Sequence, residues 1–253
     1  MNLHSFPKGS TALIQGASRG IGLGLTRALL EDSPFARVIA TCRNPSAASE
    51  LSAIEDERLS VRQLDVSDPE SVRRSAKTLS GEGVELALLI NVSGVLHGND
   101  FGPEKRFEDI EAAAFHRVYA VNTIGPALML KAYHRLMACD GKAVFAAISA
   151  RVGSIGDNRI GGWYAYRSSK AALNQILKTA SVEFGRRRKN LIVAALHPGT
   201  TDTGLSEPFQ ANVPEGKLFS VERTTGYLLS VIDDLQLEDS GGFFAWDGKA
   251  IEW

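Results

Sequence analysis

Short apolar runs alternate with longer amphipathic stretches along almost the whole chain, and this alternation restricts the fold more than any other feature of the sequence. Several runs are apolar nearly throughout instead of at every second residue, which is typical of strands covered on both faces. Repeated strand–helix units with right-handed crossovers build a parallel sheet with helices on both sides. The predicted strands are 11–15, 37–41, 59–64, 85–91, 143–149 and 191–196.

Six stretches have the amphipathic pattern of helices, and some carry start signals. Asp68 followed by Pro69 and Glu70 reads as a cap, a first-turn proline and an acidic residue near the positive end of the helix dipole. The basic run 186–189 follows another helix, where cations suit the negative end, so we interpret it that way and not as a nucleic-acid patch. The predicted helices are 20–31, 45–55, 68–79, 112–137, 164–185 and 221–235.

These elements predict an α/β protein with a three-layer doubly wound fold, in which helices cover both faces of a central parallel sheet of about seven strands. We expect a single domain over residues 1–253, because no repeat, low-complexity tract or linker divides the chain. The segment 204–220 is rich in turn-forming residues and follows the sixth predicted strand. A loop that covers a substrate and an ordinary surface loop both fit its composition.

Composition excludes several classes of function. The 253 residues include 29 acidic and 28 basic side chains, a net charge of −1, which gives no electrostatic basis for binding nucleic acid or a membrane surface. Cys42 and Cys139 are too few and too far apart for a disulfide framework or a zinc site, and we expect no metal. No apolar run approaches the length of a membrane span, and the start lacks the apolar region of a signal peptide. We therefore expect a cytoplasmic protein.

A glycine-rich turn follows the first predicted strand directly. Gly16, Gly20 and Gly22 have the spacing G-x-x-x-G-x-G. Glycine permits the tight turn and lets the backbone approach a pyrophosphate, while the N-terminus of the following helix offers free N–H groups. This turn predicts a dinucleotide site of the Rossmann type, although glycines between a strand and a helix are common in ordinary turns.

The motifs that follow, taken in order, resemble the compact single-domain branch of the short-chain dehydrogenase/reductase family over nearly the whole chain. Each motif alone is weak evidence, and their order is specific. Gln15, Val92 and Ser93 depart from the usual threonine, asparagine and alanine of the family. The motifs are the glycine turn, Asp65-Val66, Asn91-Val92-Ser93-Gly94, Asn122, Tyr166-x-x-x-Lys170 and Pro198-Gly199.

The resemblance implies a nicotinamide cofactor and the residues that hold it. Asp65 is expected to accept a hydrogen bond from the adenine, with Val66 beside the ring, and Thr201 and Thr203 are expected to hold the carboxamide. The family's positions implied in cofactor binding are Gly16, Ser18, Arg19, Gly20, Ile21, Gly22, Arg43, Asp65, Val66, Asn91, Ser93, Gly94, Tyr166, Lys170, Pro198, Gly199, Thr201 and Thr203.

Two arginines favour NADP(H) over NAD(H). In dinucleotide enzymes a carboxylate after the second strand binds the adenosine 2′-hydroxyl, but here that strand runs into Arg43. Arg43 and Arg19 both suit a 2′-phosphate. NAD(H) remains an alternative, in which Arg43 is a solvated loop residue and Arg19 a spacer.

Tyr166 and Lys170 are four residues apart and share one helix face. A free tyrosine titrates near 10, and a nearby ammonium favours its phenolate, so the pair suits general acid/base work. The family resemblance implies that Asn122 disturbs its helix locally and holds a water that links Lys170 to solvent. Alanine occupies position 150, where the family has its second serine, so Ser149 is our candidate for the substrate hydrogen bond and Ser154 the alternative.

The resulting prediction is a reductase that transfers a hydride between NAD(P)H and the carbon of a small carbonyl or alcohol substrate. The resemblance is strongest to the carbonyl-reductase subgroup, which includes a bacterial cell-contact signalling protein called C-factor. A signalling protein that binds NAD(P) with weak turnover is therefore the alternative. Family members include homodimers, homotetramers and monomers, and the sequence does not name a substrate. Candidate pocket aromatics are Trp163, Tyr164, Phe209 and Phe219, and candidate interface or core residues are Met129, Leu130, Tyr133 and Leu136.

Overall fold

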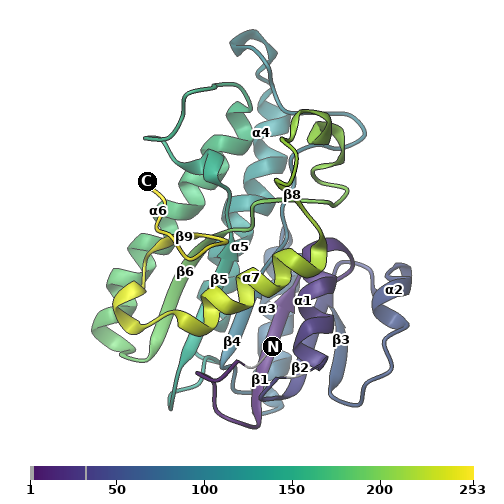
Figure 1. Cartoon of the computed structure of the whole chain (residues 1–253). Coiled ribbons are helices and arrows are strands. Elements are labelled where there is room, and N and C mark those ends of the chain that lie inside the picture. Colours follow the sequence, from purple (N-terminus) through teal and green to yellow (C-terminus); the bar gives the residue numbers. More distant parts are fainter. Residues whose placement is uncertain (1–2, 32) are drawn as a thin grey trace.

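The computed structural model describes residues 3–31 and 33–253, and a parallel sheet of seven strands in the order β3-β2-β1-β4-β5-β6-β9 forms its centre (Figure 1). The predicted fold class is confirmed. The chain order reverses between β1 and β4, which is where α/β sheets of this kind bind ligands. The strands are β1 (Ser10–Gln15), β2 (Phe35–Cys42), β3 (Leu59–Gln63), β4 (Leu88–Asn91), β5 (Ala143–Ile148), β6 (Leu191–His197) and β9 (Phe243–Ala245).

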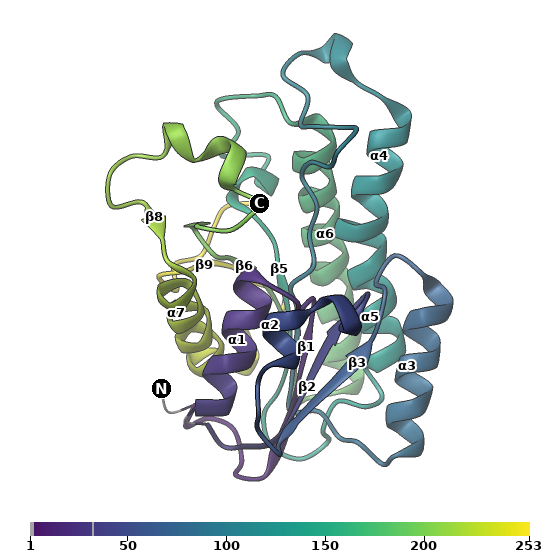
Figure 2. The same ribbon diagram turned by 90° about the vertical axis from the view of Figure 1, so that its right-hand side faces the viewer.

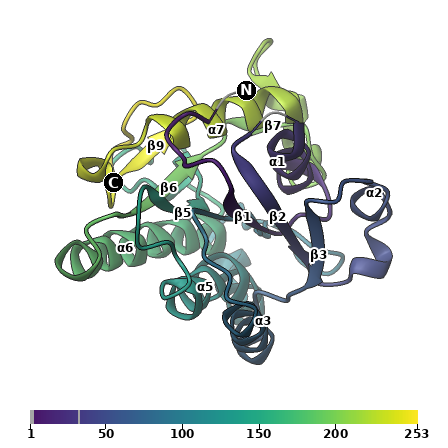
Figure 3. The ribbon, with the colours of Figure 1, turned by 90° about the horizontal axis from the view of Figure 1, so that it is seen from below.

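Helices cover both faces of the sheet (Figures 2 and 3). α1 (Gly20–Glu31) and α7 (Val221–Asp234) lie on one face, and α3 (Pro69–Gly81), α5 (Gly125–Tyr133) and α6 (Tyr164–Arg187) lie on the other. Each face of the sheet packs a hydrophobic core against its helices. Successive side chains of a strand point to opposite faces, so Ile14 belongs to the core under α1 and α7 and Leu13 to the core under α3, α5 and α6. This latter core also contains the four residues that the sequence left open between core and interface, Met129, Leu130, Tyr133 and Leu136.

Two predicted helices differ from the structure. The stretch 112–137 is divided into α4 (Ala112–Tyr119), a π-helical segment (Ala120–Ile124) and α5. Pro126 has no N–H for the carbonyl four residues earlier, which interrupts the regular α-helical pattern. A Cβ on Gly125 would lie 2.6 Å from Val66 Cγ2, so the end of this segment packs close to the loop after β3. The stretch 45–55 forms only a 3₁₀ turn (Pro45–Ala47) and α2 (Ser49–Ser52).

The other predicted elements are confirmed with shifts of a few residues at their ends. Asp68 caps α3, because its side chain accepts a hydrogen bond from Glu70 N at 2.9 Å. The sequence did not locate β9. The segment 204–220 contains a 3₁₀ stretch (Glu207–Asn212) and is closed at its base by β7 (Thr200–Thr201) pairing with β8 (Leu218–Phe219). It lies above the carboxyl ends of the strands (Figure 2).

Candidate active site

The glycine turn between β1 and α1 is fixed to the neighbouring strand. Gly16 N and Ala17 N both donate to Thr41 O at 2.9 Å, at the end of β2. Gly16 has a positive φ of +90°, and a Cβ on Gly22 would lie 2.1 Å from Gly16 O. Only glycine fits at this approach, so the turn has the tight cradle before a helix N-terminus that a pyrophosphate requires.

Two departures from the family pattern contact each other beside this turn. Gln15 Nε2 donates to Ser93 Oγ at 2.7 Å, and Ser93 N donates to Gln15 Oε1 at 3.3 Å. Each replacement therefore supplies the partner of the other, and the ends of β1 and β4 stay joined. Asn91, one of the predicted cofactor residues, is buried, and its Oδ1 has no partner among the described residues. An unpartnered buried amide oxygen at this edge suits a hydrogen-bonding ligand.

The two arginines lie where the sequence placed them, after β1 and β2. The side chains of Arg19 and Arg43 are exposed, and neither forms an ion pair with another residue of the described chain. Asp65 is already used by the backbone, because its Oδ1 accepts from Ser67 N at 2.9 Å and from Ser67 Oγ at 2.6 Å. These bonds form a turn after β3, and they leave Asp65 Oδ2 for a ligand. Ser18 and Ile21 are half-buried in the glycine turn and the first turn of α1.

Tyr166 and Lys170 lie on successive turns of α6 and are buried, with exposed fractions of 7% and 2%. Lys170 Nζ donates to Ile148 O at 2.8 Å and lies 5.7 Å from the centroid of the Tyr166 ring. Burial raises the pKa of Tyr166 and lowers the pKa of Lys170 to about 7. The lysine is therefore held at the end of β5 with a proton that titrates near neutral pH.

Asn122 joins the loop after β4 to helix α6. Its Oδ1 accepts from Val95 N at 2.8 Å, and its Nδ2 donates to Val95 O at 2.9 Å and to Ser169 Oγ at 3.1 Å. A Cβ on the exposed residue Gly94 would lie 3.6 Å from Lys170 Nζ and 3.7 Å from Asn122 Oδ1. The structure thus brings the lysine and the asparagine together around an open backbone position at the carboxyl edge of the sheet.

The two candidate serines are both buried, at 2% exposure each. Ser149 Oγ donates to Asn174 Oδ1 at 2.6 Å, and Asn174 lies one turn beyond Lys170 on α6. Ser154 Oγ accepts from Asp157 N at 3.1 Å. The proton of Ser149 is therefore used within the protein, while Ala150 between them is partly exposed.

The loop after β6 contacts the glycine turn from the other side. Thr201 is buried and shares a hydrogen bond of 2.8 Å with Thr224 through the two Oγ1 atoms. A Cβ on Gly20 would lie 3.1 Å from Thr203 Cγ2, so the Pro198–Gly199 turn leads the chain back over the start of α1. The residues predicted for the two ends of a dinucleotide thus border one continuous edge.

Aromatic side chains border the Tyr166 side of this edge. The ring of Trp163 lies 6.3 Å from that of Tyr166 and 4.9 Å from that of Phe209, between centroids. His97, which the sequence analysis missed, lies 6.0 Å from Phe209, and its Nε2 is 3.2 Å from Gly204 O. No spacing signal marks His97, because only the folded chain brings the loop after β4 to the segment 204–220.

Two of the four predicted pocket aromatics lie elsewhere. Tyr164 packs edge-on against Phe107 at 5.8 Å, and Phe219 packs against Trp246 at 4.9 Å. Of the four, Trp163 and Phe209 are thus the ones that these contacts place beside Tyr166.

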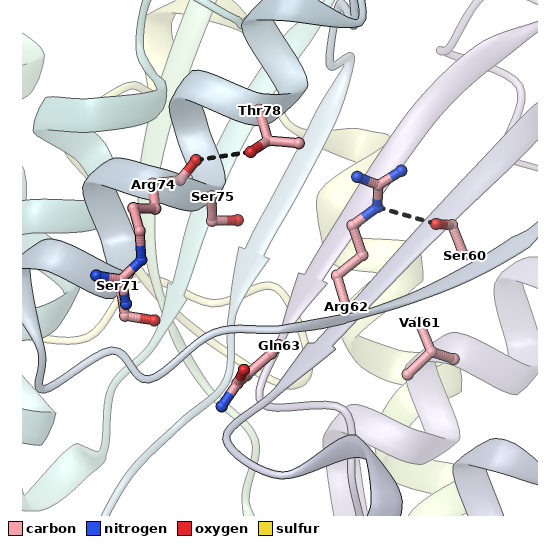
Figure 4. Close-up of a pocket in the computed structure, with 8 residues that line it drawn as sticks. All are labelled: Ser60, Val61, Arg62, Gln63, Ser71, Arg74, Ser75 and Thr78. Carbon is pink, nitrogen blue, oxygen red and sulfur yellow. Dashed lines mark hydrogen bonds between the residues drawn. The ribbon is translucent and has the colours of Figure 1, made fainter.

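Two cavities lie in the protein, one away from the candidate site residues and one that borders Ser154 and Tyr164. One, of about 620 Å³, lies between the edge strand β3 and α3 and is lined by hydroxyls and two arginines (Figure 4). Arg62 there is paired with Glu82 at 2.6 Å. A second, of about 320 Å³, lies between the 152–162 loop and the outer face of α6.

Across residues 3–31 and 33–253, no cluster of histidine, cysteine, aspartate and glutamate has the arrangement of a metal site. None of the helices described there is long and apolar enough to cross a membrane.

Comparisons with known proteins agree with this arrangement. The chain is 32% identical over 244 residues to 1-hydroxy-2-glutathionyl-2-methyl-3-butene dehydrogenase of Rhodococcus sp. (strain AD45), covering 96% of this chain and 100% of the relative. It is 32% identical over 145 residues to C-signal of Myxococcus xanthus, covering 57% of this chain and 82% of the relative. An NADPH-bound carbonyl reductase from chicken fatty liver superposes with a TM-score of 0.86 at 30% identity, covering 99% and 97% of the two chains.

The predicted resemblance to the carbonyl-reductase and C-factor subgroup is therefore confirmed at the level of relatives. The family model described as short chain dehydrogenase matches residues 10–214, from the first residue of β1 to beyond the loop that follows β6. That range contains the glycine turn, Asn122, Tyr166 and Lys170. The chain belongs to the short-chain dehydrogenase family.

Proposed function

We propose that this protein is an NADPH-dependent carbonyl reductase and that Tyr166 is its general acid. The observation that carries the proposal is that Lys170 Nζ and Asn122 Oδ1 both lie beside the exposed residue Gly94, with the ring of Tyr166 5.7 Å from Lys170 Nζ. The glycine turn and the unpartnered Asn91 Oδ1 at the same edge suit the cofactor.

A bound nicotinamide would supply the hydride for the carbonyl carbon. Tyr166 gives the hydroxyl proton to the carbonyl oxygen, which becomes the alcohol. Lys170 favours the resulting phenolate by its positive charge, and its pKa near 7 lets it give and regain a proton near neutral pH. In the oxidative direction the same groups accept the proton.

Asn122 has a positioning and relay role in this proposal. Its side-chain amide is engaged with Val95 and Ser169, so in this proposal the water binds its backbone carbonyl. Pro126 supports this role, because it has no N–H to give to that carbonyl four residues earlier. The water would pass protons between Lys170 and solvent.

The preference for NADPH is supported by charge. No carboxylate follows β2, and Arg43 and Arg19 are exposed at the ends of adjacent strands with no ion pair to a described residue. Guanidinium groups bind phosphate oxygens with good geometry. Relatives in the solved structures include the NADPH-bound chicken carbonyl reductase.

The test is Tyr166→Phe, with turnover and cofactor binding measured separately. We expect NADPH consumption with a panel of aldehydes and ketones to fall at least about a hundred-fold, because the proton donor is lost. NADPH binding, followed by fluorescence titration, is expected to change less than about two-fold, a difference well under 1 kcal/mol. A variant that reduces carbonyls at the wild-type rate contradicts the assignment.

A regulatory protein that binds NAD(P) with little turnover is the second candidate. Ala150 in place of the family's second serine and the similarity to C-signal favour it. Saturable NADPH binding together with no consumption across the whole carbonyl panel supports this candidate against the reductase.

A further inference from the structure

The residue before helix α6 has a backbone conformation that a bulky side chain rarely adopts. Trp163 has φ 55° and ψ 45°, and it is the sole non-glycine residue with positive φ in the described chain. Gly161 and Gly162, with φ of 71° and 67°, lead into it. Contacts from elsewhere must hold such a residue in place.

Glu104, in the loop between β4 and α4, supplies those contacts. Its backbone oxygen accepts from Trp163 N at 2.6 Å, and its Oε2 accepts from Ala165 N at 3.2 Å. Trp163 has no side-chain acceptor, so a carboxylate 61 residues away serves as the cap of α6. A carboxylate also suits the positive end of the helix dipole.

Glu104 is built into this junction. Its exposed fraction is 5%, and a Cβ on Gly162 would lie 3.3 Å from its backbone oxygen. Its second carboxylate oxygen, Oε1, is buried without a partner in the part of the chain that the structure describes. A buried carboxylate with one unpaired oxygen is costly, which indicates that the one hydrogen bond it does make, with Ala165 N, offsets part of that cost.

These contacts fix a wall of the candidate active site. The indole of Trp163 lies between Tyr166, at 6.3 Å, and Phe209 of the segment 204–220, at 4.9 Å. Tyr166 itself lies in the first turn of α6, directly after the residue that Glu104 caps. A shift of the capped turn would therefore move the indole relative to the tyrosine hydroxyl.

We infer that Glu104 is a positioning residue: through the cap of α6 it holds Trp163 as the surface against which the carbonyl substrate binds beside Tyr166. The kinetic part of this inference rests on the proposed reductase activity. The structural part, the dependence of the Trp163 position on Glu104, does not.

The kinetic test compares Glu104→Ala with Glu104→Gln, whose amide oxygen can still accept from Ala165 N. We expect E104A to raise the KM for the carbonyl about ten-fold, which corresponds to the free energy lost when a helix cap is removed. The kcat and the KM for NADPH are expected to stay within about two-fold of the wild-type values. E104Q is expected to recover most of the loss. The matched control is Glu108→Ala, an exposed carboxylate in the same loop, which should behave as wild type. An unchanged carbonyl KM in E104A overturns the inference.

A second readout does not need turnover. In protein labelled with 5-fluorotryptophan, the three tryptophans give three ¹⁹F signals, and Trp163→Phe identifies that of Trp163. We expect E104A to shift or broaden this signal alone, while E104Q and E108A leave it in place. An unmoved Trp163 signal in E104A overturns the inference.

The two readouts separate this inference from the proposed function. A wild-type protein that reduces no carbonyl, but whose Trp163 signal depends on Glu104, contradicts the reductase proposal and supports the positioning role. If E104A does not fold, Glu104→Asp serves the same comparison, because it keeps the charge and the backbone contact while shortening the reach to Ala165.

Discussion

At the scale of single residues, Arg43 is expected to decide the choice of cofactor. Arg43→Glu places a carboxylate where NAD-dependent enzymes have one and removes a phosphate partner. We expect the KM for NADPH to rise about ten- to a hundred-fold, the size of a lost charge-assisted hydrogen bond, and the KM for NADH to change little. Initial rates with each cofactor measure this, and an equal rise for both would contradict the assignment to the 2′-phosphate.

Position 150 makes a second residue-scale prediction. Ser149 donates its proton to Asn174, whereas Ala150 is partly exposed and occupies the slot of the family's second serine. We expect Ala150→Ser to raise kcat at least about ten-fold, since one hydrogen bond of the oxyanion type is worth about 10²–10³ in rate.

Two serine variants complete that experiment. Ser149→Ala tests our sequence-based candidate directly, and Ser154→Ala tests the alternative, whose hydroxyl accepts from Asp157 N and keeps its own proton. If S149A alone loses turnover while A150S has no effect, then the substrate hydrogen bond belongs to Ser149 despite its contact with Asn174.

At the scale of elements, the strands were predictable because a strand buried on both faces needs an apolar run, and the sequence shows that run directly. The division of the stretch 112–137 could not be predicted, because the π-helical segment depends on tertiary contacts. Gly125 packs against Val66, and the Asn122 side chain is hydrogen-bonded to the loop after β4. The three-residue strand β9 is too short to give a periodic signal.

The residues of the candidate site likewise fall into those that the sequence could indicate and those that it could not. The sequence indicated residues in ordered motifs, such as Tyr166 and Lys170, because the chemistry needs them at fixed spacing on one helix. It could not indicate Glu104 or His97, whose partners Ala165 and Gly204 lie 61 and 107 residues away. Contacts of that range follow from loop paths that no local pattern encodes.

The π-helical segment makes an element-scale prediction. Pro126→Ala gives residue 126 an N–H that can bond the Asn122 carbonyl and close a regular helical turn. We expect kcat to fall about ten-fold or more, because a proton relay contributes at least that much, without loss of thermal stability. Pro69→Ala, at the first turn of α3, is the control and should leave kcat unchanged. A P126A variant with wild-type kcat would argue against a relay through the Asn122 carbonyl.

At the scale of the whole molecule, the buried ammonium of Lys170 links folding to pH. Burial lowers its pKa from 10.5 to about 7 in the folded state, whereas the unfolded chain keeps the ordinary value. At any pH between these two pKa values, the unfolded state binds more protons than the folded state. Raising the pH through that window therefore favours the folded protein.

We expect the melting temperature to rise by several degrees from about pH 7 to about pH 9.5, measured by calorimetry at constant ionic strength. The upper limit is set by Tyr166 and Tyr133, because burial raises the pKa of each above 10.0 and reverses the slope at higher pH. His197, with a pKa lowered by burial from 6.5 to about 4, acts only on the acid side of this window.

Lys170→Met isolates the contribution, because methionine fills similar space without a titrating group. The variant should lose most of the rise between pH 7 and 9.5 and should be more stable than wild type at the acid end of that window, where wild-type Lys170 is still protonated in the interior. The exposed Lys178, farther along α6, makes a matched control as Lys178→Met and should keep the wild-type slope. If K170M and wild type show the same pH dependence, then Lys170 keeps an ordinary pKa, and a different group must exchange the proton with Tyr166 near neutral pH.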